Sequence, residues 1–258
     1  MVTLIFLFIA TITITYALNT VESNPPIETR IIGGLHAHGH SFPYQVSIRH
    51  TAKNLHFCGG SILNSTIILT AANCLIDFQP SDLNVVVGSH KLSSGGDVYT
   101  IQQLKLHEQF NKNTRENDIG LIILQTPIQY SDNIRPIKLE TRYAGSSIDV
   151  VLSGWGRISY PGVAPDNLQH INLKTISNVR CQMAHAKAPN SPSIHETQLC
   201  TFTRAGEGAC KGDFGGPLVA SDKQIGIASW GQPCALGFPD VYTRISSYLD
   251  WIATNSQV

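Results

Sequence analysis

Six cysteines and a short run of histidines are the side chains whose types and spacing most directly suggest chemistry. An even number of cysteines predicts disulfide bonds if the chain folds in an oxidising compartment, although spacing alone leaves their pairing open. His36, His38 and His40 alternate, so an extended strand would place them on one face, where they could bind a metal weakly. An exposed, solvated strand is the better interpretation because no second cluster supports a metal site. We therefore expect no metal and no cofactor.

The N-terminal end of the chain indicates the compartment. Residues 1–17 are mostly apolar, carry no charged side chain and end in the small-x-small pattern Thr15-Tyr16-Ala17. This pattern predicts a secretory signal peptide. A membrane anchor is the alternative, and it is disfavoured because the apolar run is short for a span. We therefore expect a secreted, extracellular protein without a membrane partner once the signal is removed.

A polar segment follows and ends at a basic residue. Residues 18–30 contain Pro25-Pro26, and Arg30 is followed directly by Ile31. A basic residue between an exposed segment and a packed domain is a natural processing site. The sequence thus predicts a propeptide or activation segment over 18–30 and one domain over 31–258.

The composition fits a packed domain rather than a disordered chain. Hydrophobic residues make up 42% of the sequence and charged residues 14%, which is too little charge for disorder. The formal net charge is zero, so nothing argues for a nucleic acid or an anionic membrane surface as partner. The sequon at Asn64 predicts N-glycosylation if it lies on a surface loop.

Short apolar or alternating runs predict an all-β domain. Turn-forming residues separate many of them, and this pattern is typical of barrels or a sandwich. The runs cover residues 45–48, 67–70, 83–87, 98–104, 119–124, 148–152, 171–176, 216–220 and 224–230. Near the C-terminus, Ser246 or Ser247 could cap a helix whose apolar face would include Leu249, Trp251 and Ile252.

Several longer motifs occur in a fixed order. They are Arg30-Ile31-Ile32-Gly33-Gly34, Cys58-Gly59-Gly60-Ser61-Ile62, Leu69-Thr70-Ala71-Ala72-Asn73-Cys74, Asn117-Asp118-Ile119-Gly120-Leu121, Ser153-Gly154-Trp155-Gly156, Gly212-Asp213-Phe214-Gly215-Gly216-Pro217, Ser229-Trp230-Gly231 and Pro239-Asp240-Val241-Tyr242-Thr243-Arg244. In this order and spacing the chain resembles the trypsin/chymotrypsin family of serine proteases, especially its arthropod members. The resemblance implies two six-stranded antiparallel β-barrels with a C-terminal helix. It also implies the disulfides Cys58–Cys74, Cys181–Cys200 and Cys210–Cys234.

The resemblance also bears on catalysis. Members of this family use a Ser nucleophile, a His base and an Asp that orients the His. The matching positions here hold Phe214, Asn73 and Asp118. Asn has no proton that titrates near neutral pH, and a phenyl ring is not a nucleophile. We therefore expect a serine protease homologue that is not an enzyme, with residual or atypical endopeptidase activity as the alternative.

Other family features are matched by residue. The resemblance implies that cleavage before Ile31 frees an amino group that is buried beside Asp213, and that His56 can hold this Asp before cleavage. A packed strand histidine is an equally good interpretation of His56. The backbone N–H groups of Gly212 and Phe214 match the oxyanion hole, which we interpret as a structural remnant.

The last feature that the resemblance implies is a specificity pocket. The resemblance assigns it to Gly208, Ser229, Trp230, Gly231 and Asp240. Such a pocket would admit mixed side chains, with Asp240 attracting basic ones. Alternatively, the ring of Phe214 fills the pocket and leaves Asp240 as a buried carboxyl, neutralised or hydrated.

These features favour a monomeric secreted protein that acts by binding an extracellular protein. Such a protein could be a decoy that captures peptidase inhibitors or substrates, or a regulatory partner in a proteolytic or defence cascade. The alternatives are displaced enzyme chemistry and a paralogue with little specific role. Retained cysteines, Asp213 and the processing site argue against the last of these.

Overall fold

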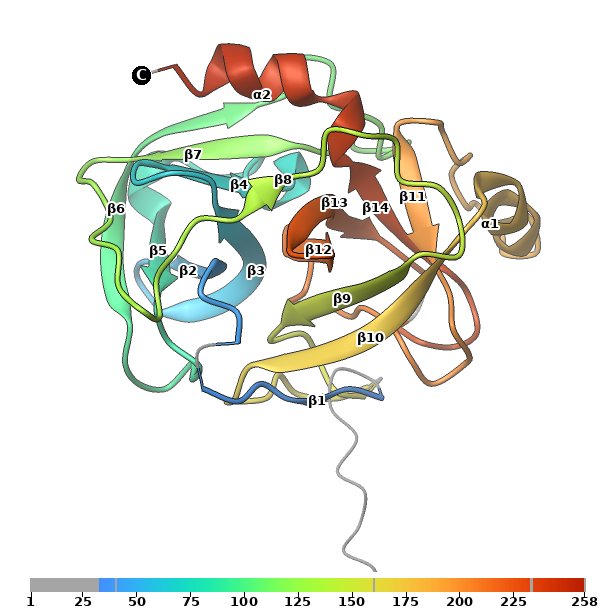
Figure 1. Cartoon of the computed structure of the whole chain (residues 1–258), viewed down its shortest axis with the longest axis horizontal. Helices are drawn as coiled ribbons and strands as arrows, with labels where there is room; N and C mark the ends of the chain where they lie inside the picture. Colours follow the sequence, from blue (N-terminus) through green and yellow to red (C-terminus); the bar gives the residue numbers. More distant parts are fainter. Residues whose placement is uncertain (1–32, 40, 160, 233, 258) are drawn as a thin grey trace, which may run out of the picture.

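The computed structural model describes residues 33–39, 41–159, 161–232 and 234–257, which form two β-barrels packed side by side (Figure 1). The expected signal peptide, activation segment and processing site all fall in residues 1–32, outside the described part of the chain. Within the described residues, no helix is both long and apolar enough to span a membrane.

The first barrel is antiparallel and closes in the order β2-β3-β4-β7-β6-β5. Its strands are β2 (Gln45–His50), β3 (Leu55–Ile62), β4 (Ile67–Thr70), β5 (Leu83–Val87), β6 (Asp97–Leu106) and β7 (Gly120–Leu124). Every residue of β4 and β7 is buried, because these neighbouring strands are covered on both faces. Their runs of Ile and Leu therefore form a large part of the barrel core.

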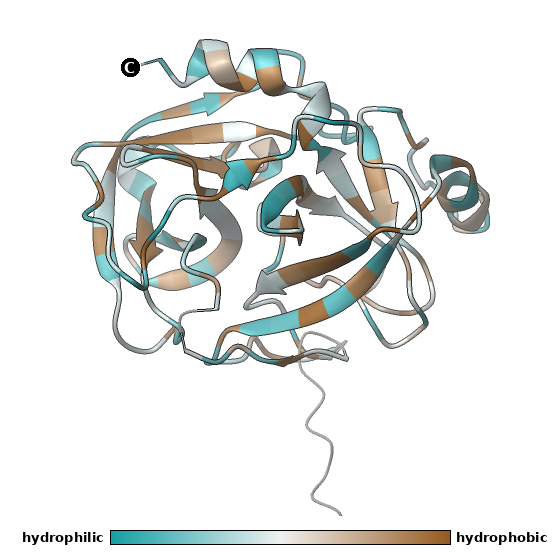
Figure 2. Ribbon diagram, in the orientation of Figure 1, coloured by the Kyte–Doolittle hydropathy of each residue, from teal (hydrophilic) through white to brown (hydrophobic). Residues whose placement is uncertain are grey.

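The second barrel closes through β10-β11-β14-β13-β12-β9, with β9 also paired to β10. Its strands are β9 (Asp149–Gly154), β10 (Gln169–Ile176), β11 (Gln198–Thr201), β12 (Pro217–Ala220), β13 (Lys223–Trp230) and β14 (Asp240–Arg244). Along β10, hydrophobic and hydrophilic residues alternate, so that one face lies in the core and the other in solvent (Figure 2). Two short strands, β1 (Leu35–His36) and β8 (Lys138–Leu139), pair with β10 and β13. The expected fold of two six-stranded antiparallel barrels is confirmed.

The C-terminal helix is present, but its start differs from the expectation. Helix α2 (Leu249–Asn255) begins after a 3₁₀ turn over Ile245–Ser247, and Tyr248 takes the N-cap position without a side-chain hydrogen bond. Ser246 and Ser247 lie inside that turn, so the expectation that one of them caps the helix was wrong. Ile252 of α2 and Tyr248 pack into the core of the first barrel, so the C-terminal helix is held against that barrel.

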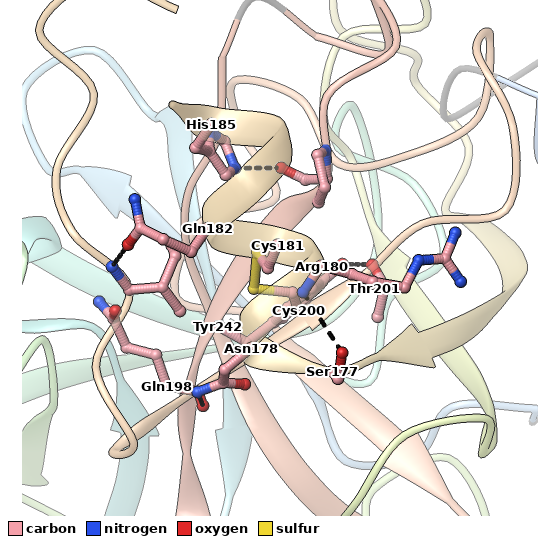
Figure 3. Close-up of a disulfide and its surroundings, with 12 residues drawn as sticks. Ser177, Asn178, Arg180, Cys181, Gln182, His185, Gln198, Cys200, Thr201 and Tyr242 are labelled. Carbon is pink, nitrogen blue, oxygen red and sulfur yellow. Dashed lines mark hydrogen bonds between the residues drawn. A yellow bond between two sulfur atoms is a disulfide. The ribbon is translucent and has the colours of Figure 1, made fainter. Parts of the chain in front are cut away.

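A second helix, α1 (Asn178–His185), was not expected from the sequence. Ser177 caps it by accepting a hydrogen bond from the backbone N–H of Arg180 at 3.3 Å. Figure 3 shows how Cys181 on its inner face is bonded to Cys200 of β11. The other two disulfides are Cys58–Cys74 and Cys210–Cys234. All three expected pairings are confirmed.

Candidate active-site cleft

A buried carboxyl lies at the junction of the two barrels. Asp118, two residues before β7, is fully buried, and its Oδ1 accepts a hydrogen bond from the backbone N–H of Asn73 at 2.7 Å. Its Oδ2 accepts a 2.6 Å hydrogen bond from the hydroxyl of Ser229 at the end of β13. Burial raises the pKa of Asp118 to about 6, while the bonds from Ser229 and Asn73 and the charge of Arg115 oppose the rise. Side chains of both barrels therefore meet at this carboxyl.

The side chain of Asn73 is held by an arginine that the sequence analysis did not single out. Asn73 lies in the 3₁₀ turn Ala72–Cys74 after β4, and its Oδ1 accepts a hydrogen bond from Nη1 of Arg115. Arg115 adopts a positive φ of 60°, and its carbonyl accepts a 3.2 Å bond from Nε2 of Gln198. The result is a polar chain from Arg115 through Asn73 and Asp118 to Ser229.

Phe214 occupies a tight turn pressed against the first barrel. Its carbonyl accepts a 2.8 Å hydrogen bond from the N–H of Gly59, and its half-buried ring packs against the first-barrel core. Gly215 follows with φ of +80°, and a Cβ there would lie 2.2 Å from the Thr70 hydroxyl oxygen. Only glycine fits this approach. The turn therefore fixes Phe214 close to the end of β4, beside the turn that carries Asn73.

A hollow of about 250 Å³ opens beside these residues. Its walls include Asn73, Arg115, Lys211, Phe214, Trp230 and Gly231. Three of the expected pocket residues, Ser229, Trp230 and Gly231, thus line the hollow, together with Phe214. The phenyl ring forms part of the wall and leaves open space next to it.

Asp240, which was expected to attract basic side chains in the pocket, lies in a different environment. Asp240, the first residue of β14, is only 7% exposed and does not line the hollow. Its Oδ2 accepts a 2.7 Å hydrogen bond from the N–H of Ala209, and a Cβ on Gly208 would lie 2.4 Å from this oxygen. Burial, and then the negative charge of Asp213, raise the pKa of Asp240 to about 8. At neutral pH the carboxyl is therefore mainly protonated, and it presents no charge to a basic side chain.

His56 and Asp213 are close in the fold but do not bond each other. Nε2 of His56 lies 2.9 Å from the carbonyl oxygen of Gly212, and Nδ1 lies 2.9 Å from Oγ of Ser47. Burial is the main cause that lowers the pKa of His56 to about 4, so the ring is neutral and donates from Nε2 to the carbonyl. Asp213 instead accepts hydrogen bonds from the backbone N–H of Gly156 at 2.7 Å and of Cys210 at 2.9 Å.

Some expected residues lie outside the described part of the chain or apart from this cleft. Arg30, Ile31 and His40 are not among the described residues. His36 forms a 2.9 Å contact between its Nδ1 and Nε2 of Gln169 in β10, away from the cleft residues. Asn64 is exposed in the loop between β3 and β4, and its Oδ1 accepts a 2.9 Å hydrogen bond from the N–H of Thr66.

Two closed barrels, with an acid buried between them and a hollow alongside, define a protein of the serine-protease fold. The model of the trypsin family matches residues 31–252, so the chain belongs to this family.

Curated relatives support the same assignment. Chymotrypsin-2 of Vespa crabro is 43% identical over 226 residues, which are 87% of this chain and 99% of that protein. Trypsin delta of Drosophila melanogaster is 35% identical over 234 residues, 90% of each chain. Among solved structures, neuropsin, a serine protease expressed in the limbic system of mouse brain, superposes with a TM-score of 0.78 at 29% identity. That comparison covers 86% of this chain and 98% of neuropsin.

These relatives contradict the expectation that the chain is not an enzyme. Proteins that share 35–43% of its residues across the domain are named as chymotrypsin and trypsin. The expectation rested on two side chains, those of Asn73 and Phe214. The class of the protein is instead assigned from the similarity over the whole domain. We correct it accordingly: the chain is a member of a family of serine endopeptidases.

Proposed function

We propose that this trypsin-family chain is a secreted protein that binds an extracellular protein in the cleft between its barrels. The partner would be a peptidase inhibitor, a substrate protein or a component of a proteolytic or defence cascade. The observation that carries the proposal is the polar chain Arg115–Asn73–Asp118–Ser229 beside an open hollow of about 250 Å³.

This arrangement favours binding because it is already formed in the chain without a ligand. Both oxygens of Asp118 have donors within 2.7 Å, so the carboxyl needs no rearrangement when a ligand enters. Neighbouring barrel strands and the disulfide Cys58–Cys74 hold the turns that carry these groups. A site that is ordered before binding loses less conformational entropy when its partner is bound.

Secretion is supported by the covalent structure. All six cysteines are paired, and three disulfides are typical of chains that fold in an oxidising compartment. The exposed position of Asn64 is the surface location that glycosylation needs. We propose further that cleavage after Arg30 precedes binding and that Asp213 receives the new amino group of Ile31.

The test compares capture of proteins from the native extracellular fluid by cleaved wild-type chain and by a cleft variant. Gln232 lines the hollow and is half-exposed, so Gln232→Trp adds a large ring at its wall. Val163 is 75% exposed and is absent from the wall, so Val163→Trp is the matched control. We expect wild type and Val163→Trp to capture the same protein and Gln232→Trp to lose it.

Hydrolysis of peptide substrates is measured on the same samples, and unfolding temperatures establish that both variants are folded. Equal capture by Gln232→Trp would place the binding surface elsewhere and refute the proposal. Turnover of the captured protein, with release of its fragments, would identify that protein as a substrate of the cleft.

A further inference from the structure

The charge of the hollow is opposite to the one its sequence motif suggests. Arg115 and Lys211 both line it, and none of the described residues that line it is an Asp or a Glu. We propose that the hollow binds an acidic side chain, the carboxylate of an Asp or Glu in a peptide segment of the partner. The inference rests on the proposed binding function and names the chemistry of the bound segment.

Arg115 is positioned to present its guanidinium to such a ligand. Nη1 donates to the Asn73 side-chain oxygen, and this contact orients the planar group at the wall of the hollow. Among the described residues, Asn73 is the one hydrogen-bond acceptor of the Arg115 side chain, and none of its nitrogens is both buried and unpaired. The remaining N–H donors are therefore accessible, and a guanidinium can bind a carboxylate through two parallel hydrogen bonds.

Lys211 supplies a second cation from the other barrel. Its side chain is exposed, and its backbone carbonyl accepts a 2.9 Å hydrogen bond from the N–H of Arg157, which fixes the main chain at this point. No salt bridge of Lys211 occurs within the described part of the chain. Its ammonium group is thus available to a ligand in the hollow.

The acids near the hollow do not form part of its wall. Asp118 interacts electrostatically with Arg115 but is fully buried and accepts two hydrogen bonds, and Asp240 is buried, with a pKa that burial raises to about 8. Glu116, next to Arg115 in the sequence, is engaged by His195 at 3.3 Å and by the Thr114 hydroxyl at 2.9 Å. The space that a ligand can enter is therefore bordered by cations.

The test measures binding of three labelled tetrapeptides that differ only in one central residue, Glu, Gln or Lys. Fluorescence anisotropy gives the dissociation constants, and mass spectrometry establishes that each peptide stays intact. We expect the Glu peptide to bind about tenfold or more tightly than the Gln peptide at low ionic strength, as for a charge-assisted contact. Added salt should reduce this preference.

Arg115→Gln and Lys211→Gln should each remove most of the preference for Glu. The exposed side chain of Lys211 makes its variant safe against misfolding. Lys187→Gln makes the same change of charge at an exposed residue after α1, outside the hollow, and should keep the preference. Equal binding of the Glu and Gln peptides, no binding of either, or an equal loss in Lys187→Gln would overturn the inference. The peptide measurements test only the preference for an acidic side chain. The proposed function is tested separately, by protein capture and its loss in Gln232→Trp.

Discussion

Replacing Asp240 by Asn should change how the stability of this protein depends on pH. The carboxyl is only 7% exposed, and one hydrogen bond, from the N–H of Ala209, stabilises its charged form. Asp213 and Tyr242 are the other titratable groups that interact with it electrostatically. An Asn oxygen could accept the same bond from Ala209, while the amide carries no charge at any pH in this range.

The sign follows from the direction of the pKa shift. The pKa of Asp240 is about 8 in the folded chain, against an ordinary value of 3.8 for an exposed carboxyl. Between these values the folded chain binds more protons than the unfolded chain, so the free energy of unfolding falls as the pH rises. One pKa unit corresponds to about 1.4 kcal/mol. Integrated from about pH 5 to about pH 9, the difference in bound protons lowers the free energy of unfolding by roughly 4 kcal/mol.

The assay is denaturant unfolding of wild type and Asp240→Asn at both ends of this range, followed by tryptophan fluorescence. Other groups also titrate, but the difference between the two proteins isolates Asp240. We expect the variant to gain roughly 4 kcal/mol over wild type on going from about pH 5 to about pH 9. The slope of the free energy of unfolding against denaturant concentration should be equal in the two proteins, because a change in stability alone leaves this slope unchanged. A difference between variant and wild type that is the same at both pH values would refute the reasoning.

Three further changes have expected outcomes. Ser229→Ala removes a hydrogen-bond donor to the buried Asp118 carboxylate and should lower the free energy of unfolding by about 2 kcal/mol at pH values above about 7. The loss should be smaller at about pH 5, where the carboxyl protonates, and urea unfolding at both pH values measures the difference. Gly215→Ala places a Cβ 2.2 Å from a hydroxyl oxygen at a φ of +80°, and should lower the unfolding temperature by an amount equivalent to at least about 1 kcal/mol. Replacing Cys181 and Cys200 together by Ala should cost about 3 kcal/mol in the same urea assay, since the disulfide closes a loop of 19 residues; an unchanged midpoint would contradict this.

The barrels could be predicted from the sequence because two signals agreed, namely the short apolar runs and the order of the family motifs. Apolar runs over residues 83–87 and 224–230 are long enough to stand out, and they appear as β5 and β13 almost unchanged. β3 was not predicted because Gly59 and Gly60 interrupt its apolar pattern. Those glycines are required by close packing, since a Cβ on Gly59 would lie 2.9 Å from the Cα of Gly216 in the other half of the chain. Tertiary contact, rather than local propensity, keeps this segment extended.

Helix α1 was missed for a related reason. Its inner face is formed chiefly by Cys181 and His185, while Val179 and Met183 are 70% and 66% exposed, so no apolar stripe marks the segment as a helix. The disulfide to Cys200 and the Ser177 cap hold it instead (Figure 3). The cap was the one local signal that could have revealed it.

The positions of Asn73, Asp118 and Phe214 were predictable from motif order, but the groups that control the cleft were not. Arg115 reaches Asn73 across a loop in which no spacing rule relates the two residues. It does so from a positive φ, which sequence patterns do not indicate for an arginine. A contact of this kind is visible only once the loop has been placed by the barrel on either side of it.

The electrostatic character of the cleft depends on exposure more than on the residue types in its motifs. Asp240 belongs to the expected pocket, yet burial leaves it mainly protonated at neutral pH and excludes it from the wall. Lys211 and Arg115 belong to no expected pocket, yet both face the open space. Burial of a carboxyl without a charged partner favours its neutral form, which has no net charge to attract a basic ligand. The proposed preference for an acidic ligand therefore follows from the two cations at the wall, Arg115 and Lys211, and not from the carboxyl of Asp240.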